Sequence, residues 1–437
     1  MPIRVLIVDD SALMRRALTS LLSSDPEIEV VGTARDGQAA IEQVAALRPD
    51  VITMDVRMPV LDGLQTTEHI MAYYPTPILV VTASLSRFDV DITFRMLGLG
   101  ALDVMEKPSS NDPNGLQQAR AELIKRVKIL SRVRVVTHLR GRRRAVDESG
   151  ANGESARLRR LRGSRPLTST GLLRRTRGSQ PLGSTDAARR TQGSRPLSSD
   201  GLRRLRGSRP LIASPSSAPK APPAAVAPPV AALQPSQRRT ALGGAERVIV
   251  IGASTGGPRV VQQILRDLPV DLPAAVLLVQ HIADGFTRGM VDWLATSCRM
   301  PVQLAQAGDV ALPGHIYVAP DNLHLLIDAH GCLSLSSQPA LLQRPSVDVT
   351  MQRAAEAYRS RLIGVLLTGM GRDGALGMAA IHREGGHTIA QSAETCIVFG
   401  MPRAAIEARV VNEVLGPDAI AGRLMMLLRE GLVKERR

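Results

Sequence analysis

Polar residues that could carry out phosphoryl chemistry end several apolar, strand-like runs near the N-terminus. Asp9 and Asp10 end the run "VLIVDD", and Asp55 lies near the end of "VITMDV". Thr82 lies near the end of "ILVVTA", and Lys107 follows "ALDVME". Ligands of open parallel sheets bind outside the carboxyl ends of the strands, so these five residues are expected to meet at one edge of a sheet.

This set of side chains predicts a phosphorylated carboxylate. Clustered carboxylates repel one another unless a cation joins them, and Mg²⁺ prefers oxygen ligands. An ammonium and a hydroxyl nearby could hold a transferred phosphoryl group. Acidic residues after strands can instead be helix N-caps, but the ordered set of five favours phosphoryl transfer.

A second candidate site begins at the turn "GASTG", where Ser254 stands between glycines after the run "RVIVIGAS". The pattern matches G-x-S-x-G, a sharp strand-to-helix turn that exposes a serine. It lacks the third glycine of a dinucleotide fingerprint and the lysine of a P-loop, so phosphate binding is less favoured here.

A nucleophilic serine needs a base and a carboxylate that orients the base. His281 ends the strand-like run "LLVQHI", and Asp373 follows "LLTGMGR". All three residues are expected at carboxyl ends of strands, where one edge can gather them. His324 and the other histidines are expected at the surface or in satisfied structural positions. The order Ser, His, Asp differs from the Ser, Asp/Glu, His order of the α/β-hydrolases.

The chain of 437 residues is expected to form two α/β domains separated by a linker. Residues 1–125 alternate five apolar runs with helical patterns, which predicts a parallel sheet covered on both faces, and residues 115–136 predict an amphipathic helix. Residues 246–430 return to this alternation. They predict a doubly wound, mainly parallel sheet, with hairpin material in "GHIYVAPDNLHLLIDAHGCLSLSS".

The net charge of +15 is concentrated in residues 140–245, which repeat the pattern "RGSRPL" and end in a Pro/Ala tract. This region lacks aromatic residues and hydrophobic periodicity, so we expect a disordered linker. Without aromatic residues, any nucleic-acid binding would be unspecific. The chain has no apolar run long enough to cross a membrane and no secretory signal, so a cytoplasmic protein is expected.

Residues 1–125 resemble the receiver domains of response regulators, which have a flavodoxin-like fold, in the ordered motifs "DD", "DVRMPVLDG", "TA" and "KP". The resemblance implies that Asp55 accepts the phosphoryl group. It also implies that Asp9, Asp10, Asp55 and the Arg57 carbonyl oxygen hold Mg²⁺, and that Thr82 and Lys107 contact the phosphoryl group. Val104 departs from the family by replacing a frequent aromatic switch residue, and Arg57 places a cation near the acceptor.

Residues 246–430 resemble the catalytic domain of the chemotaxis protein-glutamate methylesterase family, CheB. The matching segments are "IGASTGGP", "VQHIADGFT", "AGDVALPGHIYVAPDNLHL", "RPSVDV", "LLTGMGRDGA" and "TIAQSAETCIVFGMPRAA". By this resemblance Ser254 is the nucleophile, His281 the base and Asp373 its partner. The backbone N–H groups of Thr255 and Met370 form the oxyanion hole, and no cofactor is needed.

The resemblance implies hydrolysis of glutamyl methyl esters, and deamidation of glutamines, on methyl-accepting chemotaxis receptors. Phosphorylation by the chemotaxis histidine kinase would control the reaction, and the enzyme would be recruited to receptor arrays at the membrane. Two alternatives stay open. The same chemistry could act on a non-receptor protein ester or amide, or the chain could be a scaffold that binds anionic partners through its linker.

Overall fold

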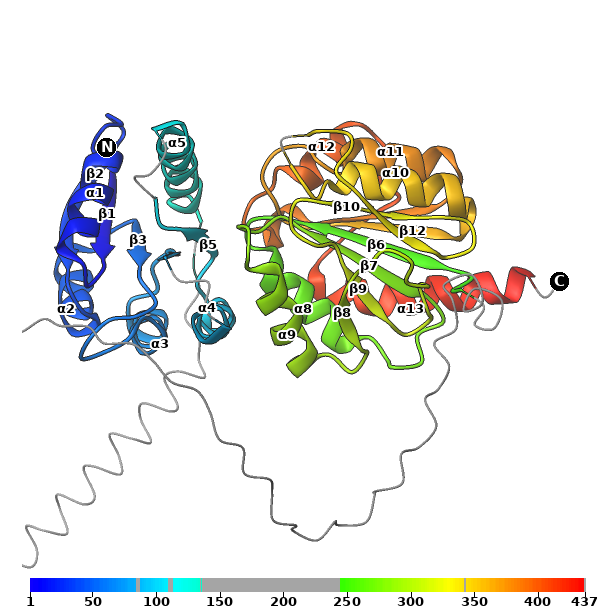
Figure 1. Cartoon of the computed structure of the whole chain (residues 1–437), viewed down its shortest axis with the longest axis horizontal. Coiled ribbons are helices and arrows are strands. Elements are labelled where there is room, and N and C mark those ends of the chain that lie inside the picture. The colour runs from blue at the N-terminus through cyan, green and yellow to red at the C-terminus, as the bar shows by residue number, and fades with distance from the viewer. Residues whose placement is uncertain (84–86, 109–112, 134, 136–243, 342, 436–437) are drawn as a thin grey trace, which may run out of the picture. The chain divides into compact units, whose positions relative to one another are not determined.

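A computed structural model describes the chain apart from residues 84–86, 109–112, 134, 136–243, 342 and 436–437 (Figure 1). Nearly all of the linker expected at 140–245 therefore lies outside the described residues. The described residues form an N-terminal and a C-terminal α/β region.

The N-terminal region is built on a five-stranded sheet in the order β2-β1-β3-β4-β5, with every pair of neighbours parallel. The strands are β1 (Ile3–Val8), β2 (Ile28–Ala34), β3 (Val51–Met54), β4 (Ile78–Thr82) and β5 (Asp103–Glu106). The helices are α1 (Ala12–Leu22), α2 (Gly37–Leu47), α3 (Gly63–Tyr73), α4 (Arg87–Leu99) and α5 (Pro113–Leu130). The expected parallel sheet of five strands is confirmed. The helix predicted over 115–136 corresponds to α5, which begins earlier, at Pro113, and ends earlier, at Leu130.

Alternation along the strands divides the core of this region between the two faces of the sheet. On one face Val5 and Ile7 of β1 pack with Leu18 of α1 and Leu123 of α5. On the other face Leu6 and Val8 pack in a cluster with residues of α2 and α3. Because helices cover both faces, the central strands are mainly apolar, although β1 contains Arg4 and β3 contains the buried Thr53.

The N-caps of these helices are not the acidic residues that end the strands. Ser11 caps α1 by accepting a hydrogen bond from the Met14 N–H, and Asp36 caps α2. Asp62 and Gln65 form a capping box at the start of α3. Asp10 and Asp55 are therefore not needed as helix caps, and this leaves their carboxylates available for other contacts.

The C-terminal region contains a seven-stranded parallel sheet in the order β14-β13-β12-β6-β7-β9-β8. Its strands are β6 (Val248–Ala253), β7 (Ala275–Gln280), β8 (Val302–Leu304), β9 (Ile316–Val318), β12 (Leu362–Leu366), β13 (His387–Gln391) and β14 (Glu413–Leu415). Its α-helices are α8 (Gly257–Asp267), α9 (Thr287–Ser297), α10 (Val347–Tyr358), α11 (Ala375–Arg383), α12 (Met401–Glu407) and α13 (Pro417–Glu435). Two short 3-10 turns are η1 (Arg359–Arg361) and η2 (Ala393–Thr395).

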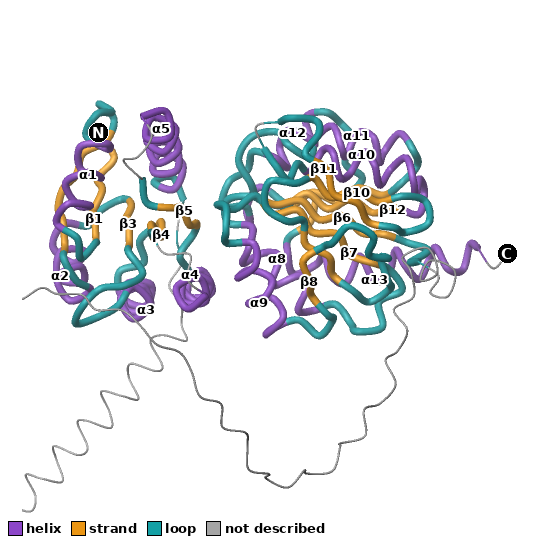
Figure 2. The backbone as a smooth tube through the Cα atoms, viewed as in Figure 1, coloured by secondary structure: helices purple, strands orange, loops and turns teal. Residues whose placement is uncertain are grey.

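Helices cover both faces of this sheet, with α10, α11 and α12 on one side and α8, α9 and α13 on the other (Figure 2). Val250 and Leu277 pack with Met351 of α10, while the alternate residues Ile251 and Leu278 pack with Ile264 of α8. The expected doubly wound parallel sheet is confirmed.

The predicted hairpin segment divides between two sheets. β10 (His324–Ile327) and β11 (Leu333–Ser336) form an antiparallel hairpin, as predicted. Ile316–Val318 instead forms β9, which pairs in parallel with β7 and β8 of the main sheet. A short apolar run can form a parallel or an antiparallel strand pair. Here pairing with β7, which is distant in sequence, makes β9 a parallel strand of the main sheet.

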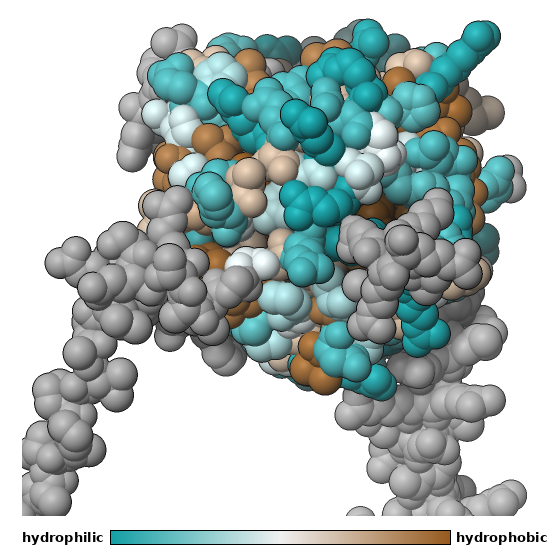
Figure 3. All heavy atoms as spheres, turned by 90° about the vertical axis from the view of Figure 1, so that its right-hand side faces the viewer, coloured by the Kyte–Doolittle hydropathy of each residue, from teal (hydrophilic) through white to brown (hydrophobic). Residues whose placement is uncertain are grey.

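The face of the C-terminal region in Figure 3 is mostly hydrophilic, with scattered hydrophobic residues. Among the described residues, no helix is both long enough and apolar enough to cross a membrane.

Candidate active site and phosphoacceptor site

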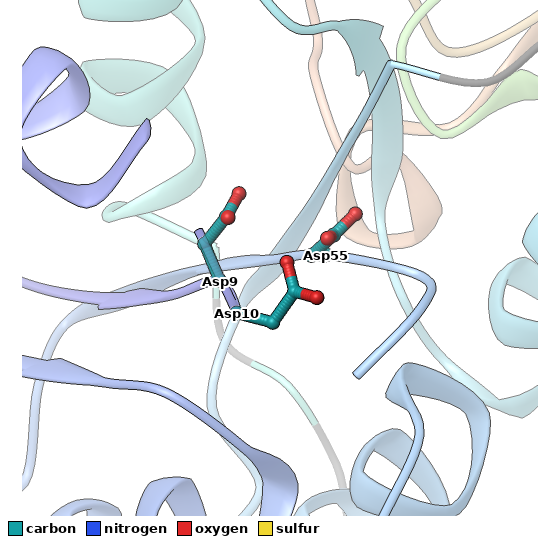
Figure 4. A group of neighbouring side chains, drawn as sticks. All are labelled: Asp9, Asp10 and Asp55. Atoms are coloured by element: carbon teal, nitrogen blue, oxygen red, sulfur yellow. The ribbon is translucent and has the colours of Figure 1, made fainter. Parts of the chain in front are cut away.

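Three carboxylates gather at the carboxyl edge of the N-terminal sheet (Figure 4). Asp9 and Asp10 follow β1, Asp55 follows β3, and each offers an oxygen within 4.8 Å of the others. Asp9 and Asp55 are buried, whereas Asp10 is exposed. Lys107, directly after β5, places its Nζ 2.7 Å from Asp9 Oδ2 and 2.8 Å from Asp55 Oδ2.

Burial and Lys107 shift the pKa of Asp55 in opposite directions. Burial raises the pKa of Asp55, and the hydrogen bond from Lys107 partly opposes that shift. Burial disfavours the charge of Lys107, but hydrogen bonds to Asp55 and Asp9 prevail and raise its pKa. A single ammonium does not neutralise three carboxylates, and their oxygens are ligands that suit Mg²⁺. The residues present therefore fit the ion that the sequence predicts.

The other predicted receiver residues lie around this cluster. Thr82 is the last residue of β4, paired in register with Glu106 immediately before Lys107, and it is buried. The Arg57 side chain forms an ion pair with Asp89 of α4. Val104 is buried in β5, at the position where many receivers carry an aromatic residue.

The second candidate site lies at the carboxyl ends of three adjacent strands, β12, β6 and β7. β6 pairs with both neighbours, with Gly252 opposite Leu366 and Ala253 opposite Gln280. The backbone N–H of Ser254 donates to the Thr368 carbonyl at 3.0 Å, and that of His281 donates to the Ala253 carbonyl at 2.9 Å. This register places Ser254 beside His281 on one side and the Thr368–Met370 turn on the other.

Close approach of the backbone explains two glycines around Ser254. Gly256 has φ +76° as the chain turns into α8, a conformation that favours glycine. A Cβ at Gly369 would lie 2.8 Å from Ser254 Cβ, so a side chain there would displace the serine. These glycines let the chain turn sharply after β6 and bring the Met370 segment against it.

His281 and Asp373 form the contact that orients the imidazole. His281 Nε2 lies 2.9 Å from Asp373 Oδ2. Burial works to raise the pKa of Asp373, but the hydrogen bond and charge of His281, with backbone N–H donors, lower it to about 2. An ionised Asp373 favours a proton on Nε2, and this leaves Nδ1 as the ring nitrogen able to accept another.

Three members of the predicted set therefore converge at one sheet edge, with different degrees of contact. His281 and Asp373 are hydrogen-bonded, and Ser254 adjoins His281 through the strand register. Within the described residues, no hydrogen bond joins the His281 ring to the Ser254 hydroxyl. Such bonds are often long without substrate and shorten in the reacting complex.

Several residues that support the site were not given roles from the sequence. Gln280 Nε2 donates to the carbonyl oxygens of Ser254, at 2.8 Å, and His281, at 2.9 Å. Ser346 Oγ donates to Asp373 Oδ1 at 2.9 Å. The fully buried His324 accepts from the Ser346 N–H at 3.1 Å, which matches its expected role as a satisfied residue. The motif "RPSVDV" was the available sequence signal for Ser346.

Comparisons with known proteins agree with this division of the chain. The CheB methylesterase family model matches residues 249–424, and the response regulator receiver domain model matches residues 5–119. A "protein-glutamate methylesterase/protein-glutamine glutaminase" from Symbiobacterium thermophilum is 37% identical over 433 residues, covering 98% of both chains. A protein of the same description from Anaeromyxobacter dehalogenans, numbered 3, is 37% identical, covering 98% of this chain and 99% of its own.

Among solved structures, the Thermotoga maritima CheB methylesterase catalytic domain is 39% identical. The match covers 41% of this chain and 98% of that chain, with a TM-score of 0.41.

The fold and the two family models define a response-regulator protein, in which a receiver domain precedes an α/β methylesterase domain. The near full-length relatives make the assignment specific: the chain belongs to the CheB methylesterase family. The enzyme class expected from the sequence, a carboxylic ester hydrolase, is thereby confirmed.

The contacts of Lys107 predict how the acidic cluster responds to metal. In Lys107→Gln the ammonium no longer competes with a cation for Asp9 and Asp55, so Mg²⁺ should bind at least about tenfold more tightly. Isothermal titration of the full chain with Mg²⁺ measures this. Lys125→Gln removes an exposed lysine 3.9 Å from Glu122 and serves as the control. Equal Mg²⁺ affinity in both variants would contradict the assignment of these carboxylates as the metal ligands.

Proposed function

We propose that this chain hydrolyses glutamyl methyl esters, and deamidates glutamines, on methyl-accepting chemotaxis receptors during sensory adaptation. The observation that carries the proposal is the hydrogen bond between His281 and an ionised Asp373 at the strand end beside Ser254. The alignment of the half-buried Asp373 carboxylate with His281 supports an active hydrolase over an inactive scaffold. The names of the near full-length relatives support the choice of substrate.

In the proposed reaction the Ser254 hydroxyl oxygen attacks the ester carbonyl carbon, and its proton passes to His281 Nδ1. The negative charge that develops on the carbonyl oxygen is stabilised by the backbone N–H groups of Thr255 and Met370. The carbon–oxygen bond to the methoxy group then breaks, and His281 returns the proton so that methanol leaves. The product of this half-reaction is a glutamyl ester of Ser254.

Water completes the cycle. It attacks the acyl carbon and gives one proton to His281, and the bond to Ser254 breaks as His281 returns that proton to the serine oxygen. Glutamate is released, and the enzyme is restored. With a glutamine substrate the same steps release ammonia in place of methanol. Asp373 stays ionised throughout and stabilises the imidazolium that forms at each transfer.

The N-terminal domain is proposed to regulate this activity by phosphorylation at Asp55. An Asp55 oxygen would attack the phosphorus of the kinase phosphohistidine, the phosphorus–nitrogen bond would break, and the kinase histidine would leave. Thr82 and Lys107 would bind the transferred group. Asp9, Asp10, Asp55 and the Arg57 carbonyl would hold Mg²⁺, which when bound offsets the charge of the phosphoryl oxygens. Recruitment to receptor arrays at the membrane would follow from the substrate.

The nucleophile is tested with Ser254→Ala in the full chain. Methanol release from methylated receptor is expected to fall by at least about 10⁴-fold, because no other hydroxyl can form the acyl-enzyme. Ser334→Ala, which changes an exposed serine of β11, serves as the control. Methanol release at the control rate by Ser254→Ala would refute the nucleophile assignment.

Regulation is tested by the ratio of methanol release with acetyl phosphate and Mg²⁺ to release without them. We expect stimulation in the wild type and a ratio of about one in Asp55→Ala, since that variant lacks the acceptor carboxylate. Asp50→Ala, which alters a carboxylate bonded to the Arg4 N–H, should retain the stimulation. Stimulation of Asp55→Ala equal to that of the wild type would exclude Asp55 as the regulatory acceptor.

A further inference from the structure

Asp348 lies in the first turn of α10, and Asp373 lies just before α11. Each carboxylate accepts hydrogen bonds from backbone N–H groups at the start of the other residue's helix. Asp373 Oδ2 accepts from the Val347 N–H at 2.7 Å, and its Oδ1 accepts from the Asp348 N–H at 3.0 Å. Both donors lie in the first turn of α10. In return, Asp348 Oδ1 accepts from the N–H of Gly374, the N-cap residue of α11, at 2.8 Å and from the N–H of Gly377, in the first turn of α11, at 2.7 Å.

This exchange satisfies N–H groups that have no partner within their own helix, and each carboxylate meets the positive end of a helix dipole. It also fixes the backbone next to Asp373. Gly374 directly follows Asp373, has φ +96°, and would bring a Cβ within 2.3 Å of Leu366. The hydrogen bond from Gly374 to Asp348 therefore holds the peptide from which the Asp373 side chain projects.

Stability alone does not explain an acid at position 348. Burial, and then the charge of Asp373, raise the pKa of Asp348 to about 6, so its ionised form is disfavoured beside Asp373. Both hydrogen bonds to the α11 turn use the same oxygen, Oδ1. What distinguishes the residue is where its oxygen lies, between α10 and the peptide that carries Asp373.

We propose that Asp348 is a positioning residue for the esterase reaction, holding the α11 turn so that Asp373 stays aligned with His281 Nε2. The proposal rests on the proposed function of Ser254, His281 and Asp373. Asp348 acts through Asp373 and makes no contact with the reacting atoms in the proposed mechanism.

The test compares three substitutions of Asp348 with one matched control in the full chain. Asp348→Ala removes the acceptor, and Asp348→Asn keeps an Oδ1 acceptor without the charge. Asp348→Glu keeps the charge but moves the oxygens by one methylene. The control is Asp328→Ala. Asp328 Oδ1 also accepts two backbone N–H groups, of His330 and Cys332, in the β10–β11 turn away from the site.

We expect Asp348→Ala to lower kcat for methanol release by about 10- to 100-fold with little change in KM, because misalignment of Asp373 affects the transition state. Asp348→Asn should recover most of kcat, and Asp348→Glu should recover less. Asp328→Ala should keep the wild-type kcat even if its thermal midpoint falls. A better recovery by Glu than by Asn would overturn the proposal, since charge and not position would then matter.

A second readout does not depend on substrate. The His281 proton bonded to Asp373 should give a far-downfield proton resonance, which Asp348→Ala and Asp348→Glu should shift or broaden and Asp328→Ala should leave unchanged. An unchanged resonance in both Asp348 variants, with wild-type kcat in either, would contradict the proposal.

If Ser254→Ala released methanol normally, the proposed function would fail, yet this resonance would still decide the role of Asp348. Asp348→Asn keeps an Oδ1 atom that can accept hydrogen bonds from the Gly374 and Gly377 N–H groups. It therefore provides a folded reference if Asp348→Ala is unstable.

Discussion

The partial or complete burial of carboxylates at the carboxyl edges of the two parallel sheets is the constraint on which both candidate sites depend. A carboxylate removed from water is stable only where hydrogen-bond donors or opposite charges replace the solvent. Asp373 receives donors from Ser346, from the first turn of α10 and from His281. The elements that supply these donors are therefore also the elements that align the imidazole.

In the N-terminal domain, the Lys107 ammonium replaces the solvent around the buried carboxylates, whereas backbone N–H groups at a helix start do so around Asp373. Lys107 lies between Asp9 and Asp55, and its pKa is raised by those two partners. The compensation is incomplete, because Asp10 adds a third carboxylate to the group. Residual negative charge at the N-terminal cluster suits a divalent cation, whereas the donors around Asp373 include the His281 ring and backbone N–H groups. The negative charge of the carboxylates is thus offset in different ways at the two sites, and this difference matches the phosphoryl chemistry proposed for one and the ester hydrolysis proposed for the other.

Strand register joins the parts of the esterase site across long stretches of sequence. Ser254, His281 and the Thr368–Met370 segment follow β6, β7 and β12, which lie side by side in the sheet. Small residues at the points of contact, such as Gly369 against Ser254, allow this approach. Gln280 then links the carbonyl groups of Ser254 and His281, so two of the proposed catalytic residues share one buried support.

Much of this arrangement is determined by the sequence alone. Continuous apolar runs predict buried parallel strands, and polar residues just after them predict where chemistry can occur. Asp55, Ser254, His281 and Asp373 could thus be singled out without a structure. Only the tertiary structure decided what surrounds them. Ile316–Val318 joins the main sheet, and Asp348 and Asp373 each accept hydrogen bonds from N–H groups at the start of the other residue's helix. Strand partners and helix-end donors come from segments distant in sequence, and neither periodicity nor local propensity carries information about which distant segments will meet.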